Sequence, residues 1–181
     1  MNDTSQARHD FKQIDTASWQ NADKPVAIWM QMTAVVKTPA EWADFFLQPQ
    51  LKPTVPTEIV RLLEVARGAM ICGWFLYPLL TLGADQCWRV LEAGVRLRCQ
   101  QLGIKTKRTK EKGREEDTKF SENIGALLRS KIAVKLDKSR WDAVRKLRNS
   151  TSHPSRQVNS DPGLAQGVLA TAVELLNDLF S

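Results

Sequence analysis

The chain of 181 residues suits one domain of ordinary size with an appendage, and it is long enough to bury a hydrophobic core. Hydrophobic residues make up 43% of it and charged residues 25%, which are values of a globular protein rather than of a disordered chain. The formal charge of +6 and the pI near 9.4 favour an anionic partner, and nucleic acid is the first candidate.

The N-terminal part of the chain is predicted to lie outside the main body. Residues 1–24 are polar and aperiodic, so we expect a flexible tail. This tail contains no hydrophobic signal region, which favours a cytoplasmic location. Residues 25–56 are predicted to form an N-terminal appendage, and the apolar run 25–37 within it fits either a strand or a helix.

One helix of this appendage has a clear start and is predicted over about 38–48. Thr38 suits the N-cap, Pro39 suits the first helical position, and Glu41 lies three residues after the cap. Residues 48–56 contain three prolines and are predicted to be a linker to the main body.

Residues 57–181 are predicted to form an all-α, up-and-down bundle of four or five helices. Their apolar residues recur at three- and four-residue spacing, which is the period of a helix with one buried face. The helices are expected over about 57–72, 74–102 and 118–131, from 139 into the stretch 148–154, and over 162–180. Residues 105–119 hold seven basic and four acidic residues and are predicted to be a mobile, charged loop.

The cysteines and the longest uncharged run of the chain are both predicted to belong to the core. Cys72, Cys87 and Cys99 have no zinc or redox spacing, so they are predicted to be reduced core residues and no metal site is expected. The uncharged run 69–84 is shorter than the roughly 20 residues that span a bilayer, and it contains a proline. We therefore expect a buried helix pair there and no membrane partner.

The fourth predicted helix has its own start signal and core face. Ser139 is predicted to be its N-cap, with Asp142 completing a capping box. Trp141, Val144 and Leu147 are then expected to face the core.

The end of this helix, Arg148-Asn149-Ser150-Thr151-Ser152-His153-Pro154, gives the strongest indication of function. Pro154 disfavours helical geometry at His153, so the chain should turn there and can bring the imidazole towards Arg148. Histidine transfers protons near neutral pH, and arginine binds phosphate oxygens, which suits phosphodiester cleavage. RNA carries its own nucleophile, the 2′-hydroxyl, so neither a metal nor a cofactor is required. The alternative is that both side chains simply cap a helix end and bind water.

The stretch RNSTSHP resembles the R-x(4–6)-H signature of the HEPN superfamily (higher eukaryotes and prokaryotes nucleotide-binding domains), which are short all-α domains. Residues 64–99, EVARGAMICGWFLYPLLTLGADQCWRVLEAGVRLRC, are similar to the first helical hairpin of that family. The resemblance covers about residues 57–180. It implies a metal-independent endoribonuclease that forms a homodimer, in which both motifs line one cleft. Such a protein would be a toxin or an antiviral defence effector, with an antitoxin or a sensor protein as a possible regulator.

The resemblance also implies residue roles. Arg148 would stabilise the phosphate, His153 would transfer the proton, and Asn149 would orient or bind the substrate. An acidic residue on the second helix often supports the site in this family, and Asp85 and Glu92 both fit. Each equally fits an ordinary surface pair with the arginine four residues later, so the choice stays open.

The charged loop adds a candidate RNA-binding surface. Four of its basic residues would give it salt-dependent affinity for phosphates: Lys105, Lys107, Arg108 and Lys110. The same composition equally fits a solvated linker of mixed charge without a binding role. Two other functions are compatible with the sequence. One is a non-catalytic RNA-binding or adaptor HEPN module, and the other is a helical protein-interaction domain.

Overall fold

The computed structural model describes residues 12, 15–109, 114–130, 136–151 and 160–181, with residues 149–151 described by their backbone alone. The elements within this part are α1 (Lys24–Thr33), α2 (Pro39–Leu47), α3 (Thr57–Cys72), α4 (Leu79–Gln101), β1 (Lys107–Thr109), β2 (Glu115–Asp117), α5 (Phe120–Arg129), α6 (Lys138–Thr151) and α7 (Pro162–Leu179). The predicted class, an all-α helical bundle, is confirmed.

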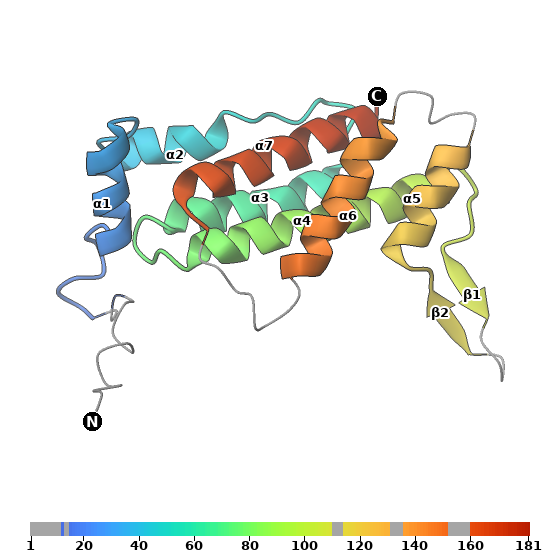
Figure 1. The fold of residues 1–181 in the computed structure, drawn as a ribbon, viewed down its shortest axis with the longest axis horizontal. Coiled ribbons are helices and arrows are strands. Elements are labelled where there is room, and N and C mark those ends of the chain that lie inside the picture. Colours follow the sequence, from blue (N-terminus) through green and yellow to red (C-terminus); the bar gives the residue numbers. More distant parts are fainter. Residues whose placement is uncertain (1–11, 13–14, 110–113, 131–135, 152–159) are drawn as a thin grey trace.

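Helix α4 is the centre of the bundle. It contacts α3, α5, α6 and α7, and Figure 1 shows α3, α4 and α7 lying lengthwise beside one another. Helix α6 crosses α4, while α5 and the small β-hairpin extend from the end where α4 stops. This arrangement brings the last turn of α6 and the first turn of α5 to the same side of α4.

Two glycines let neighbouring helices approach α4 closely. A Cβ atom added at Gly83 would lie 2.8 Å from the carbonyl oxygen of Ala66 and 2.5 Å from Cγ of Met70, both on α3. A Cβ atom added at Gly94 would lie 2.8 Å from Cδ2 of Leu176 on α7. Helix geometry alone would favour alanine at both positions. Backbone atoms of α3 require glycine at position 83, whereas the overlap at position 94 is with the end of a leucine side chain.

Substitution of Gly83 with alanine is expected to lower the free energy of unfolding by about 2 kcal/mol, because the new methyl group overlaps backbone atoms that cannot move aside. Gly68 on α3 is a matched control, since a Cβ atom there meets nothing within 4 Å. Gly68→Ala should raise the same quantity by about 0.5–1 kcal/mol through helix propensity. Urea unfolding followed by circular dichroism measures both, and equal effects of the two substitutions would contradict the packing argument.

The segment predicted as an appendage shares the core of the bundle. Its apolar run 25–37 forms a helix, α1, and not a strand. Trp42 and Phe46 of α2 are fully buried in the same hydrophobic cluster as α3, α4 and α7, and Nε1 of Trp42 donates to the carbonyl of Ile71 at 2.9 Å. At the end of the predicted flexible tail, Asp23 is 1% exposed and accepts a hydrogen bond from the backbone of Tyr77 at 2.7 Å.

Helix starts agree with the sequence at α2 and α7 but not at α6. Thr38 caps α2 as predicted and accepts from the backbone N–H of Glu41. The capping box predicted at Ser139 is wrong, because Asp137 lies at the start of α6 and accepts both the backbone N–H and the hydroxyl of Ser139, at 2.8 and 2.7 Å. These hydrogen bonds lower the pKa of Asp137. Asp142 instead binds Nζ of Lys138 at 2.9 Å.

In place of a loop over 105–119, the structure has an antiparallel hairpin. Its register pairs Lys107 with Asp117 and Arg108 with Glu116, so each basic residue stands opposite an acidic one. The charged residues that led to the prediction of a solvated loop thus form the cross-strand pairs of the hairpin. Residues 110–113, which connect the two strands, lie outside the described part.

The three cysteines are free thiols in different environments. Cys87 and Cys99 are buried as predicted, and burial raises their thiol pKa values to about 12 and about 11. Cys72 was predicted to be a core residue but is exposed at the last position of α3. Among the described helices none is long and apolar enough to cross a membrane.

Candidate functional site around Arg148

The candidate site is built around Arg148 in the last turn of α6. Trp141 and Val144 of that helix are buried as predicted, but Leu147 was expected in the core and is 50% exposed. Arg148 lies four residues after Val144, so it continues the buried face of α6 by one turn. The row of buried side chains on α6 therefore ends in the guanidinium group of Arg148, which faces α4.

Glu92 of α4 is the acidic partner of that group. Nη2 of Arg148 lies 3.1 Å from Oε2 of Glu92, and the two side chains are 39% and 31% exposed. At its other end α6 is held by Arg140, whose Nη2 lies 2.5 Å from Oε2 of Glu174 on α7. Two ion pairs, one at each end of α6, thus set the position of Arg148 against α4.

The polar stripe of α4 makes contacts between elements, and not the pair predicted between Glu92 and Arg96. Arg96 instead places Nη1 at 2.6 Å from Oδ2 of Asp117 at the end of β2. Successive turns of α4 therefore hold α6 and the hairpin. Asp85, the other acidic candidate, lies two turns before Glu92, and its partial burial raises its pKa while Arg89 acts in the opposite direction.

A pocket of about 310 Å³ adjoins the Arg148–Glu92 pair. It opens between α4, α6 and the start of α5, and its lining residues are Glu92, Lys119, Phe120, Ser121, Arg145 and Arg148. Three of these side chains are cationic and one is anionic. Two positive charges are therefore left in the lining after Glu92 has been matched with Arg148.

Arg145 is held less firmly than Arg148. Its nearest ionic partner is Oδ1 of Asp142 at 3.7 Å, which is too long for a hydrogen bond. Asp142 is bonded to Lys138, and this hydrogen bond, helped by the nearby positive charges, lowers the pKa of Asp142. Nε of Arg145 is enclosed and has no hydrogen-bond partner within the described part of the chain. An enclosed donor of this kind is unfavourable unless a ligand or water completes it.

Sequence reasoning found Arg148 and Glu92 but missed the other cationic residues of the pocket. Arg145 precedes Arg148 by three residues and so shares its face of α6, and this spacing could have been recognised in the sequence. Lys119 and Ser121 lie at the start of α5 and approach the pocket through the tertiary fold alone, so no sequence pattern marked them.

The remaining predicted site residues fall elsewhere. His153 and Lys110 lie outside the described residues, and Asn149 is described as helical backbone alone. Lys107 pairs with Glu115, and Arg108 pairs with Glu116 and Glu122. Lys105 is exposed just before β1 and, like these two, does not line the pocket.

The arrangement suits the binding of an anion. Guanidinium groups donate in a planar fork that matches phosphate or carboxylate oxygens, and the start of a helix adds N–H groups and a partial positive charge. No group of three or more His, Cys, Asp and Glu residues within the described ranges is placed to hold a metal ion. A scan against models of protein families, a search of curated proteins and a search of solved structures each found no match to this chain.

Proposed function

We propose that this chain is a HEPN-type, metal-independent endoribonuclease that acts as a toxin or an antiviral defence effector. The observation that supports it best is the position of Arg148, the arginine of the RNSTSHP motif. Arg148 lies beside a positively charged pocket and is paired with Glu92 of α4. Helix α4 corresponds to the second helix of the helical hairpin in the proposed family. The basic charge of the chain supports an anionic substrate as well.

In the proposed reaction the 2′-hydroxyl oxygen attacks the adjacent phosphorus and the bond to the 5′-oxygen breaks. His153 takes the proton from the 2′-hydroxyl, the leaving 5′-oxygen takes a proton from water, and the imidazolium later returns its proton to solvent. Arg148 donates hydrogen bonds to the non-bridging oxygens, where negative charge grows in the transition state. The products carry a 2′,3′-cyclic phosphate and a 5′-hydroxyl group.

Glu92 has a positioning role in this proposal. A guanidinium group has five N–H donors in a plane, so one edge can hold a carboxylate while another faces a phosphate. The pair with Glu92 fixes the rotamer of Arg148 before substrate arrives, which lowers the cost of ordering a long side chain.

The proposal includes a homodimer in which two Arg148–His153 pairs line one cleft. RNA is the proposed substrate, and an antitoxin or a sensor protein is the proposed regulator. No cofactor takes part in the chemistry. A single mass of twice the chain mass in light scattering is the expected result, and a monomer at micromolar concentration would remove the shared cleft from the proposal.

The test is to incubate the purified protein with RNA in EDTA and to determine the chemistry of the new ends. We expect cleavage, with cyclic phosphate at one end and 5′-hydroxyl at the other. Salt-dependent RNA binding without cleavage would instead indicate a non-catalytic RNA-binding module. A protein without RNA affinity would indicate a helical interaction domain.

A further inference from the structure

We propose that the pocket between α4, α5 and α6 binds a terminal phosphate monoester, with Lys119 and Arg145 as its principal ligands. This inference rests on the proposed function for the nature of the ligand, an RNA strand. It goes beyond that function because cleavage requires no recognition of a strand end.

The charge of the lining favours a phosphate monoester. Glu92 and Arg148 form a pair at 3.1 Å, and the partner of Arg145, Asp142 at 3.7 Å, lies outside the lining. Lys119 and Arg145 therefore supply the excess positive charge of the lining. A phosphate monoester carries about −1.5 to −2 charges near pH 7, whereas an internal diester carries about −1. A lining with two excess positive charges therefore matches a monoester more closely than a diester.

The start of α5 supplies hydrogen-bond donors to the pocket. Phe120 and Ser121 are the first two residues of α5, and the N–H groups of a first helical turn have no partner inside the helix. Both residues line the pocket, so the N–H groups at this end of α5 can be donated to a ligand there, while Glu122 caps the N–H of Lys119 at 2.7 Å. The guanidinium group of Arg145, whose side chain is 43% exposed, supplies further donors.

The size of the pocket suits one phosphate group and its sugar. A volume of about 310 Å³ stands at the lower limit of small-molecule sites, which run from roughly 300 to 1,000 Å³. It accommodates a phosphate group with the sugar that carries it, while the rest of the strand leaves the pocket.

The consequence for the proposed enzyme is selectivity for an end. Its own products would carry a cyclic phosphate and a 5′-hydroxyl, and neither is a monoester. Strands that already have a terminal phosphate would therefore bind in preference to the products of the reaction.

The test measures binding of one oligonucleotide sequence with 2′-O-methyl groups throughout, which prevents attack by the 2′-oxygen and separates binding from cleavage. Three forms are compared by fluorescence anisotropy: with a 5′-phosphate, with a 3′-phosphate and with neither. We expect at least one phosphorylated form to bind about tenfold more tightly than the unphosphorylated strand. Equal affinity for all three would overturn the proposal and leave binding to internal diesters alone.

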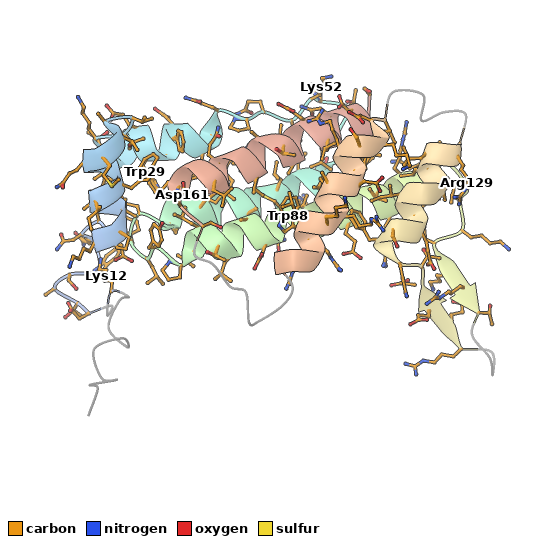
Figure 2. The ribbon with its side chains drawn as sticks, in the orientation of Figure 1. Lys12, Trp29, Lys52, Trp88, Arg129 and Asp161 are labelled. Atoms are coloured by element: carbon orange, nitrogen blue, oxygen red, sulfur yellow. The ribbon has the colours of Figure 1, made fainter. Side chains whose placement is uncertain are left out.

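Substitutions then assign the preference to the pocket. Lys119→Gln with Arg145→Gln should abolish it, and Glu92→Gln should increase it severalfold because a negative charge leaves the lining. Arg129→Gln is the matched control, since Arg129 is an exposed cation in the last turn of α5, at the far end from the pocket (Figure 2). A preference that survives the double substitution, or one that Arg129→Gln removes, would place the phosphate elsewhere.

Two further measurements keep the result interpretable. If the double variant does not fold, Lys119→Gln alone is sufficient, because Lys119 is exposed and contributes its backbone N–H to the start of α5. Competition by adenosine monophosphate and by inorganic phosphate shows whether the pocket requires a strand or takes any phosphate monoester. A phosphate preference in a protein that never cleaves RNA would contradict the proposed function and leave this site intact.

Discussion

Replacement of Arg148 with alanine is expected to lower the rate of RNA cleavage by about 10³-fold, because the transition state loses a donor at the oxygens that gain charge. His153→Ala should have an effect of at least that size through loss of proton transfer. Stability should change little. The pair of Arg148 with Glu92 is more than a third exposed on the arginine side, and such pairs contribute about 0–1 kcal/mol to folding.

Glu92 variants test whether its role is to position Arg148. Glu92→Gln keeps an oxygen that accepts from the guanidinium, so cleavage should fall by about threefold to tenfold, and Glu92→Ala should cause a larger loss. The loss should appear in kcat, since the transition state depends most on the orientation of Arg148. Rescue by glutamine, together with the opposite change in phosphate binding, would not arise from a general loss of stability.

The ion pair of Arg96 with Asp117 provides the matched control for this series. It stands one turn further along α4, is also partly exposed, and joins α4 to the hairpin without lining the pocket. Asp117→Asn should leave the cleavage rate within about twofold of wild type, because this pair contributes little beyond about 1 kcal/mol. The measurements are the cleavage rate of each variant with a fluorescent RNA and an unfolding curve of the same variant, which separate loss of activity from loss of stability. An active Arg148→Ala protein would contradict the proposed role of the motif.

The helices could be predicted from the sequence because each has one apolar face, and Thr38 provides an N-cap that the structure also shows. The hairpin at 107–117 could not, because its strands contain no apolar residues and their pairing depends on charges opposite one another. The burial of Asp23 could not be predicted from the sequence either, since its partners, the backbone groups of Trp74 and Tyr77, lie more than 50 residues away. Local patterns carry no information on such distant partners.

The site was predictable to the extent that a single helix carries it. Arg148 was identified from its motif, but its acidic partner stayed ambiguous, because Asp85 and Glu92 share one stripe of α4. The crossing point of α6 decides between them, and this depends on how side chains pack along α4. Lys119 comes from a third element, so its approach to Arg145 follows from the fold as a whole.

The largest expected effect on stability concerns Arg67, a buried cation of α3 that holds the N-terminal segment. It is 5% exposed; its Nε donates to the carbonyl of Phe46 at 3.1 Å, and its Nη2 donates to the carbonyl of Pro49. Its third nitrogen, Nη1, pairs with Glu64. One guanidinium group therefore satisfies a carbonyl group in the last turn of α2 and another in the segment that follows it. Carbonyl groups at a helix end have no partner within the helix.

Arg67→Ala is expected to lower the free energy of unfolding by about 3 kcal/mol, because it leaves buried carbonyl groups without donors and creates a cavity. This corresponds to a fall in Tm of about 6–12 °C for a chain of this size. Arg67→Lys keeps the charge but lacks the planar fork, so it should recover part of the loss. Arg61→Ala, on the exposed side of the same helix, should change stability by less than about 0.5 kcal/mol.

The N-terminal segment gives a second readout of the same substitution. If Arg67 holds it, the alanine variant should be cut by protease in the connection between α2 and α3 at temperatures well below its Tm, while Arg61→Ala stays resistant. The fluorescence of the buried Trp42, which packs beside Phe46, should shift to longer wavelength at those temperatures. Unfolding in one step at all probes would instead show that α2 and the bundle form a single cooperative unit, in which Arg67 contributes stability without controlling local release.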